Sequence, residues 1–297
     1  MIATGKRYTD KLSAKRIQGV LFLTAGYGTR AEPLSFCRPK ALLPWQSTTL
    51  LSNLVSQFAV LDLEIMAFNA SRCPELVLQE GSRHWSGKTK LLFEERPLGL
   101  PGTLSRNREM FKGDWIVVNT DMVLDVPVEE MVEFHLMSGS RWTVLTGNFP
   151  DFGNYGGLHL NGRICHYLGI SIISPEIVAL AAREQLGTGY FTSLRSAAKA
   201  GNISIREFFT DSQWLDMGEV HLFRKHLLSQ GSYIHPSAQV HDEATLGGFY
   251  WIGSSCIVNR GAVIRDSVML EGSILLPGKS LIGCVLPWFS NKELEID

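Results

Sequence analysis

The chain has 297 residues, of which 45% are hydrophobic and 19% charged, and its formal net charge is −1. This length allows two domains with buried cores, and the composition is that of a soluble globular protein. The near-neutral charge shows no nucleic-acid footprint, and no apolar run approaches the roughly 18 residues needed to cross a bilayer. We therefore expect neither a nucleic-acid nor a membrane partner.

The N-terminal segment, residues 1–18, is locally basic but lacks the apolar centre of a signal peptide. We interpret it as a solvated extension. The 5 cysteines are odd in number and form no C-x-x-C pair. This usage fits reduced thiols rather than a disulfide framework or a zinc site, so a cytoplasmic location is predicted.

A short apolar run, Gly19 to Phe22, predicts a buried strand that leads into the sequence LTAGYGTRAEPLSFCRPKALLPW at 23–45. Gly26 and Gly28 let the backbone turn sharply and bring its N–H groups against a ligand. The glycines are followed by a threonine and two cations: Thr29, Arg30 and Lys40. This loop is suited to a polyphosphate, although its spacing is that of neither a P-loop kinase nor a nicotinamide dehydrogenase. A glycine turn needed only for steric reasons is the alternative.

The same loop resembles the G-x-G-T-R-…-P-K signature of the nucleotide-sugar pyrophosphorylases, also called sugar-1-phosphate nucleotidylyltransferases. The resemblance implies that the loop wraps a nucleoside triphosphate and that Arg30 and Lys40 hold its phosphates as catalytic residues. The residues of this loop that the resemblance assigns to nucleotide binding are Leu23, Ala25, Gly26, Gly28 and Thr29.

From Gly19 to about Ser229, strand-like and helix-like segments alternate. The expected strands after the first are Glu64 to Phe68, Lys90 to Phe93, Trp115 to Val118 and Trp142 to Leu145, and the expected helices are Leu50 to Leu61, Thr103 to Phe111 and Val128 to Met137. This alternation predicts an α/β fold with a Rossmann-like, mostly parallel sheet and helices on both faces. Ligand-binding loops of such sheets lie at the carboxyl ends of the strands.

The segment EERPLGLPGTL at 94–104 follows one of these strands and resembles the family's E-x-x-P-L-G-T-A-G segment, which sits against the nucleobase. The resemblance adds four nucleotide-binding residues: Glu94, Pro97, Gly99 and Gly102. Leu100 and Pro101 replace small residues of the pattern, and the proline removes one backbone donor. A plain turn is the alternative for this segment.

An aspartate, Asp121, emerges from the apolar strand DWIVVN, and Thr120 stands where the family's N-G-D pattern has glycine. A carboxylate at the ligand edge of a sheet can hold Mg2+, which bridges substrate phosphates, although it could also cap a turn. The segment 213–228 resembles the family's W-x-D-x-G-T-x-E-x-Y pattern. That resemblance implies that Asp216 is the second ligand of the same Mg2+ and that Trp214 packs beside the site.

The sugar-binding part departs from the most common pattern, because residues 161–177 contain no E-K-P motif. Compact members similar to the muramate 1-phosphate uridylyltransferases and to some guanylyltransferases show the same shortening, together with a segment like 148–160. The sugar-binding candidates are Asn154, Gly156, Gly169 and Trp214. Three further side chains, His159, His166 and Tyr167, could line the pocket, but a histidine on a strand is more often held there by hydrogen bonds than catalytic.

A period of six begins near Ser232. The repeated aliphatic residues are Ile234, Val240, Leu246, Ile252, Val258, Ile264, Leu270, Leu276 and Ile282, and alanines follow some of them at 238, 244 and 262. This period predicts a hexapeptide-repeat, left-handed parallel β-helix of three coils over residues 234–287. We expect a catalytic domain at 19–230, the β-helix at 231–290 and a tail at 291–297. The coils could also mediate a homo-oligomer.

The expected reaction joins a nucleoside triphosphate to a sugar 1-phosphate, with Mg2+ as cofactor, to give a nucleotide sugar and pyrophosphate. The alternatives are a catalytically weak regulatory or scaffolding homologue, a hexapeptide acyltransferase and a cytidylyltransferase that acts on a phosphorylated alcohol such as choline phosphate. The base stays open between guanylyl, uridylyl and thymidylyl transfer, because the contacts that select base and sugar fall in the segments that depart from the pattern.

Overall fold

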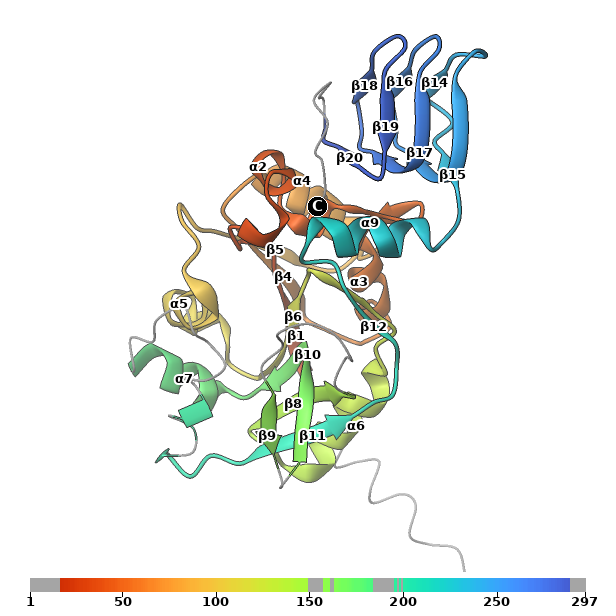
Figure 1. Cartoon of the computed structure of the whole chain (residues 1–297). Helices are drawn as coiled ribbons and strands as arrows, with labels where there is room; N and C mark the ends of the chain where they lie inside the picture. Colours follow the sequence, from red (N-terminus) through yellow and green to blue (C-terminus); the bar gives the residue numbers. More distant parts are fainter. Residues whose placement is uncertain are drawn as a thin grey trace, which may run out of the picture. The chain divides into compact units, whose positions relative to one another are not determined.

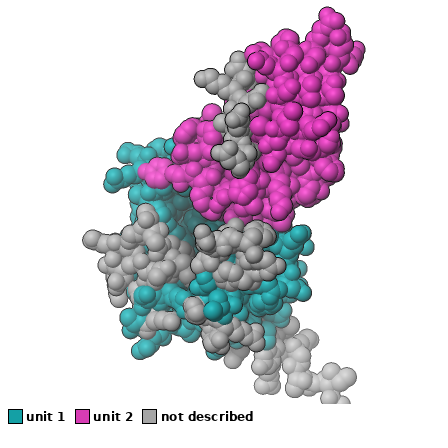
Figure 2. Space-filling view, viewed as in Figure 1, with its two compact units in different colours: residues 1–26, 51–120, 124–214 teal, residues 27–50, 121–123, 215–297 magenta. Residues whose placement is uncertain are grey.

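A computed structural model of the chain describes residues 17–148, 157–160, 163–183, 195–196, 198 and 200–288. The chain divides into two compact units (Figure 2). Unit 1 comprises Met1–Gly26, Leu51–Thr120 and Leu124–Trp214, and unit 2 comprises Tyr27–Leu50, Asp121–Val123 and Leu215–Asp297. The boundary therefore falls inside the glycine loop. No helix in the described part of the chain is long and apolar enough to cross a membrane.

Unit 1 is built on an eight-stranded sheet with the order β11-β8-β10-β6-β1-β4-β5, and β9 pairs with β10 (Figure 1). Its strands are β1 (Ile17–Leu23), β4 (Ile65–Ala70), β5 (Thr89–Phe93), β6 (Asp114–Asn119), β8 (Trp142–Gly147), β9 (Leu158–Leu160), β10 (Arg163–Ile173) and β11 (Ile205–Phe209). The pairs β1–β4, β1–β6, β4–β5 and β8–β11 are parallel, whereas β10 runs antiparallel to β6 and β8. The expected mostly parallel sheet is confirmed.

Helices cover both faces of this sheet. They are α3 (Leu50–Phe58), α4 (Pro74–Ser82), α5 (Gly99–Arg106), α6 (Val128–Ser138) and α7 (Pro175–Arg183), with a 3-10 turn η3 (Arg108–Met110) after α5. Leu104 of α5 and Ile177 of α7 join one buried cluster with Leu21 of β1. On the other face, Phe22 stacks on Phe68 and meets Phe58 of α3 edge-on. Because both faces are covered, the strands read as continuous apolar runs.

The expected helix Thr103 to Phe111 begins and ends earlier, as α5. Pro101 lies in the first turn of α5, where backbone N–H groups have no partner within the helix, so the proline removes no helical hydrogen bond. The chain then leaves the helix at Asn107, whose N–H bonds to Thr103 O, and η3 follows.

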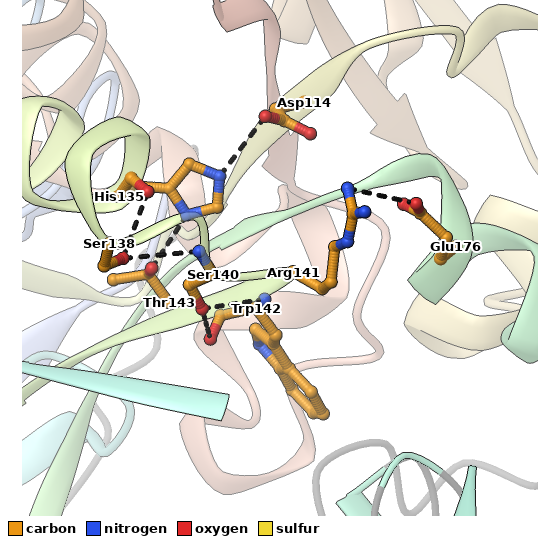
Figure 3. Close-up of polar contacts among 8 residues, drawn as sticks. All are labelled: Asp114, His135, Ser138, Ser140, Arg141, Trp142, Thr143 and Glu176. Atoms are coloured by element: carbon orange, nitrogen blue, oxygen red, sulfur yellow. Dashed lines mark hydrogen bonds and ion pairs between the residues drawn. The ribbon is translucent and has the colours of Figure 1, made fainter. Parts of the chain in front are cut away.

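A buried polar network ties α6 to two strands of unit 1 (Figure 3). His135 is 1% exposed; its Nδ1 lies 2.7 Å from Thr143 Oγ1 and its Nε2 3.4 Å from Asp114 Oδ2. The order of hydroxyl, imidazole and carboxylate is that of a nucleophilic triad. Thr143 is fully buried, however, so its hydroxyl cannot reach a substrate and the network is structural.

Unit 2 contains residues 27–50, which we call the loop flank because they continue from the glycine loop, together with the C-terminal region. Its elements before residue 230 are η1 (Thr29–Ala31), α2 (Leu34–Cys37), η2 (Lys40–Leu42), β2 (Pro44–Trp45), β3 (Thr48–Thr49) and α9 (Val220–Leu228); β7 (Met122–Leu124) pairs with β12 (Trp214–Asp216) at the unit boundary. Leu43 and Trp45 share one buried core with Phe223 of α9 and with Trp251 and Val268 of the C-terminal strands. The loop flank is thus held in the same core as the C-terminal strands.

The C-terminal strands form two parallel ladders, β13-β15-β17-β19 and β14-β16-β18, and β20 also pairs with β17. Their bounds are β13 (Tyr233–Ile234), β14 (Gln239–Val240), β15 (Thr245–Ile252), β16 (Ile257–Val258), β17 (Val263–Met269), β18 (Ile274–Leu275), β19 (Ser280–Ile282) and β20 (Val285–Leu286). We call residues 233–286 the parallel-strand region. Its ladders are consistent with the expected β-helix.

In a regular β-helix every aliphatic residue of the six-residue repeat would face inward, but this expectation is wrong for the last residues of the repeat. Gly247 pairs with Arg265, an offset of 18, whereas Tyr250 pairs with Ser267, an offset of 17, so one residue of β15 is left out of the ladder. Because β17 has one residue fewer here than β15, Met269 rather than Leu270 pairs with the inward-facing Ile252, and from Met269 onward the inward position lies one residue earlier. Leu275 and Leu281 are therefore buried, while Leu276 and Ile282 are 41% and 57% exposed.

Two more residues of the repeat also point elsewhere. Ile234, in the first coil, is 39% exposed. Leu270 is buried, but it packs in the core that contains Phe223 and Trp288 rather than among the side chains inside the coils. Val258 and Ile264 do lie in that interior cluster, as the period predicts.

Candidate active site

Arg30 lies among three carboxylates, all within unit 2. Its Nη2 is 3.7 Å from Asp121 Oδ2, and its Nη1 is 3.6 Å from Asp216 Oδ2 and 3.8 Å from Glu219 Oε1. These residues come from three separate stretches of the chain. The structure therefore brings together three of the four predicted catalytic residues.

The backbone at Gly28 sets the direction of Arg30. Gly28 has φ +71°, a left-handed conformation that favours glycine, and directly precedes η1. A Cβ at this position would lie 2.8 Å from Ser35 Cβ and 3.3 Å from Lys40 Cε. Any larger residue would displace the chain that carries Arg30 and Lys40.

Asp216 is held by its own backbone turn. Its Oδ1 accepts a 2.6 Å hydrogen bond from Gly218 N, and the side chain is 5% exposed. Met217 N donates to Asp121 O at 3.0 Å, which links the two predicted metal ligands through the backbone. A Cβ on Gly218 would lie 2.7 Å from Asp216 Oδ1 and 2.8 Å from Arg30 Nη2, so a larger residue there would displace one of these two side chains.

Lys40, the fourth predicted catalytic residue, reaches the same segment. Its Nζ donates a 2.6 Å hydrogen bond to the carbonyl oxygen of Gly218. Burial lowers the pKa of Lys40, and the carboxylates of Asp121 and Asp216 oppose that shift. The ammonium group is thus partly desolvated, which strengthens its interaction with an anion that replaces water.

The carboxylate pair fits a divalent cation. In this structure one cation, the Arg30 guanidinium, already lies within 4 Å of both Asp121 and Asp216. In the described part of the chain, no group of three or more His, Cys, Asp or Glu side chains could hold a metal ion. Mg2+ is commonly bound by one or two carboxylates together with substrate phosphates, so a pair is sufficient.

Glu219 is a site residue that the sequence interpretation missed. It occupies the position of the threonine in the W-x-D-x-G-T pattern, and besides Arg30 it pairs with His221 Nδ1 at 3.4 Å. A glutamate at the position where the pattern has threonine was the sequence feature that could have identified Glu219 as a site residue. It places a third negative charge beside Arg30.

A separate network in unit 1 organises the start of the glycine loop. Asn69, at the end of β4, accepts hydrogen bonds at Oδ1 from the backbone N–H groups of Thr24 and Ala25, at 2.7 and 3.2 Å. Its Nδ2 donates to Glu94 Oε1 and to Thr103 Oγ1, both at 3.2 Å. The side chain therefore connects the two predicted nucleotide-binding loops. No motif pointed to Asn69.

Glu94, predicted to bind nucleotide, is instead engaged within the protein. It is 1% exposed, Thr103 Oγ1 donates to its Oε1, and Leu98 N donates to its Oε2 at 2.9 Å. Glu94 thus shapes the loop that contains Pro97 and leads into α5 at Gly99. Gly102 lies within α5, where a Cβ would be 2.7 Å from Leu98 Cβ.

The remaining loop candidates lie at strand ends. Leu23 is the last residue of β1, and its carbonyl accepts a 2.7 Å hydrogen bond from Thr120 Oγ1. Thr120, which replaces the glycine of the family pattern, therefore ties the end of β6 to the end of β1. Ala25 is buried and Gly26 exposed in the loop that follows, and Thr29 opens η1.

Of the sugar-binding candidates, the structure describes two. Gly169 has φ +81° at the irregularity where β10 leaves its register with β8. Trp214 contacts His166, with ring centroids 4.6 Å apart in an edge-on arrangement. Burial raises the pKa of Tyr167, which packs against the core of unit 1. Asn154, Gly156 and the side chain of His159 lie outside the described residues.

Comparison with known proteins finds similarity to nucleotidyltransferases. The profile described as nucleotidyl transferase matches residues 19–157. The mannose-1-phosphate guanyltransferase of Candida albicans is 23% identical over 91% of this chain and 86% of its own, and the putative mannose-1-phosphate guanyltransferase of Sulfolobus acidocaldarius is 26% identical over 84% and 75%.

A solved structure has the same fold. The putative glucose-1-phosphate thymidylyltransferase of Bacillus anthracis aligns with a TM-score of 0.60 at 15% identity, over 70% of this chain and 93% of that one. The matched profile spans the glycine loop, Lys40 and Asp121, which carry the site described above. The profile match and the guanyltransferase relatives support a nucleotide-sugar pyrophosphorylase family for this chain.

Proposed function

We propose that this chain transfers a nucleotidyl group from a nucleoside triphosphate to a sugar 1-phosphate. The observation that carries the proposal is the cluster in which Arg30 faces Asp121 and Asp216 while Lys40 bonds to Gly218, between them. Two cations and two carboxylates in one place suit a substrate that carries several phosphates and a divalent cation. The nucleotidyl transferase profile over residues 19–157 supports the same reaction class.

The reaction needs no covalent enzyme intermediate. An anionic oxygen of the sugar phosphate attacks the α-phosphorus, and the bond between that phosphorus and its bridge to the β-phosphate breaks. Pyrophosphate leaves with the electron pair. Since the attacking oxygen is already deprotonated near neutral pH, no general base is required, and catalysis reduces to positioning and charge neutralisation.

Arg30 and Lys40 are assigned to the charge that develops on the departing pyrophosphate. Arg30 offers a planar fork of donors, whereas Lys40 offers a point charge of fixed position. Asp121 and Asp216 would hold Mg2+, which neutralises phosphate charge when it is bound. Arg30 must exchange its contacts with these carboxylates for phosphate oxygens, and its half-exposed side chain leaves it free to do so.

For the substrates, we propose mannose 1-phosphate and GTP as the first pair. This choice is supported by the names of the relatives from Candida albicans and Sulfolobus acidocaldarius, which cover most of this chain. Nucleotide-sugar binding without turnover is a second candidate. The observation that favours it is Glu219, which adds a negative charge beside Arg30.

The test is a grid of ATP, GTP, CTP, UTP and dTTP against mannose, glucose and muramate-type sugar 1-phosphates with Mg2+, read by pyrophosphate release. Choline phosphate with CTP tests the cytidylyltransferase alternative in the same plate. Asp216→Asn protein measures background release. We expect GTP with mannose 1-phosphate to exceed every other pair. Absence of release above that background for every pair, with nucleotide sugar still bound in calorimetry, would establish the binding-only candidate instead.

A further inference from the structure

Arg38 lies in the loop flank, two residues before Lys40, and its side chain is held by the C-terminal part of unit 2. Its Nη1 is 2.6 Å from Glu271 Oε2, a residue of the parallel-strand region. Its guanidinium carbon lies 5.5 Å from the ring centre of Trp288, a cation–π contact. Trp288 is buried, so the ring that supports Arg38 is itself fixed.

The backbone between Arg38 and Lys40 has little freedom. Arg38 is extended, with φ −145° and ψ 150°, as expected for a residue that precedes proline. Pro39 fixes the next φ at −56°, and Lys40 then opens η2, in which Leu42 N donates to Pro39 O at 2.9 Å. The orientation of the Arg38 guanidinium is therefore transmitted to the backbone of Lys40.

We propose that Arg38, Glu271 and Trp288 form a clamp that positions Lys40 for phosphate binding. None of the three needs to touch substrate, so they are positioning residues. The clamp gives the parallel-strand region a part in transition-state stabilisation, and in this respect it rests on the proposed function.

The effect of the clamp on the rate can be measured separately from its effect on the stability of unit 2. The loop flank is already held by Leu34, Leu43 and Trp45, which are buried in the core shared with Phe223 and Val268. The Glu271 side chain is 40% exposed, and ion pairs at such positions contribute little to stability. Loss of the pair should thus leave the melting temperature almost unchanged while it releases Lys40 from its position. Misplacement of a catalytic group by about 1 Å can cost up to about a hundredfold in rate.

The experiment uses full-length protein with three changes: Glu271→Gln, Arg38→Lys and the charge exchange Arg38→Glu with Glu271→Arg. The two single variants should lower kcat about three- to thirtyfold, with KM for the sugar 1-phosphate unchanged. The exchange should recover part of this loss, because it restores the ion pair but not the contact with Trp288. Glu243→Gln is the matched control, since it breaks the exposed Arg260–Glu243 pair of the same region and should change no kinetic constant.

Binding of inorganic pyrophosphate, measured by calorimetry, provides a second readout that does not require turnover. Glu271→Gln should bind pyrophosphate several-fold more weakly than the wild type. An active wild type with kinetically normal Glu271→Gln and Arg38→Lys variants would overturn the clamp alone. An inactive wild type whose pyrophosphate binding still depends on Glu271 would overturn the proposed function alone. If kcat and melting temperature fell together in both single variants, Arg38 would be a structural residue and the clamp would be wrong.

Discussion

Lys40 Nζ donates a 2.6 Å hydrogen bond to the backbone carbonyl of Gly218, 178 positions later in the chain. Gly218 N in turn donates to Asp216 Oδ1 at 2.6 Å. One peptide segment is therefore bonded on one side to Lys40, which we propose binds phosphate, and on the other to Asp216, which we propose binds Mg2+. A substitution of Lys40 or of Asp216 should therefore alter the position of the other side chain.

The carboxylate pair gives the first prediction. Asp121→Asn and Asp216→Asn should each lower kcat by about a hundredfold or more, because each removes half of the protein's charge toward Mg2+. Pyrophosphate release over a range of Mg2+ concentrations measures both the rate and the metal requirement, which should rise. Asp125→Asn, an exposed acid next to the same strand, is the control. Near-normal rates at ordinary Mg2+ in either variant would contradict the assignment.

Arg30 and Lys40 give the second prediction. Arg30→Ala should lower kcat by more than it raises KM for the triphosphate, since the guanidinium is assigned to charge that grows in the transition state. Lys40→Ala should behave similarly. Steady-state kinetics with the best substrate pair separate the two constants. A change confined to KM in both variants would make them binding groups only.

Glu219 gives the third prediction. Its carboxylate lies 3.8 Å from Arg30 Nη1, so it competes with phosphate for the guanidinium and repels the incoming triphosphate. Glu219→Gln and Glu219→Thr should therefore lower KM for the triphosphate about two- to tenfold, an effect that weakens at high salt. The KM at 20 and at 500 mM salt is the measurement. A rise of KM in both variants would show that Glu219 assists binding.

The shifted register of the coils is tested by two adjacent leucines. Leu275→Ala should destabilise the protein by about 2–5 kcal/mol, because Leu275 is buried among the side chains inside the coils. Leu276→Ala should cost less than about 1 kcal/mol, since that side chain is 41% exposed. Urea denaturation of both variants compares them directly. A larger loss of stability in Leu276→Ala than in Leu275→Ala would show that Leu276 faces inward, as an unbroken period of six predicts.

His226 gives a prediction about pH. Burial lowers the pKa of this α9 histidine, and the neighbouring charge of Lys225 lowers it further. Between this depressed pKa and the ordinary value near 6.5, the unfolded chain binds more protons at His226 than the folded protein does. Stability should therefore fall as the pH drops through this window, at up to about 1.4 kcal/mol per pH unit.

In His226→Leu and His226→Gln this contribution is absent, so both variants should lose less stability than the wild type between pH 7 and pH 5. Urea unfolding at pH 7, 6 and 5 measures the difference. Equal slopes for the wild type and both variants would show that folding does not lower the pKa of His226.

Local sequence patterns were sufficient for most of the fold, and they selected residues that the structure brings together, whereas the catalytic roles of those residues stay predictions. The alternation of strands and helices, and the placement of Arg30, Lys40 and Asp121 after strands, follow from rules about the carboxyl edge of parallel sheets. The resemblance added Asp216, and the structure places it beside Arg30. The division into catalytic domain and β-helix, the cytoplasmic location and the homo-oligomer stay predictions.

By itself, the sequence determined which segments are buried and where the glycine loop turns, because side-chain periodicity and glycine conformation are local properties. Only the tertiary structure decided the inward face of the last coil, which depends on a single residue left out of the ladder between Gly247 and Tyr250. It alone also decided the roles of Glu94, which bonds within the protein, and of Arg38, which pairs with Glu271 at a distance of 233 positions. Such contacts join segments that are far apart in the sequence, so no local sequence pattern predicts them.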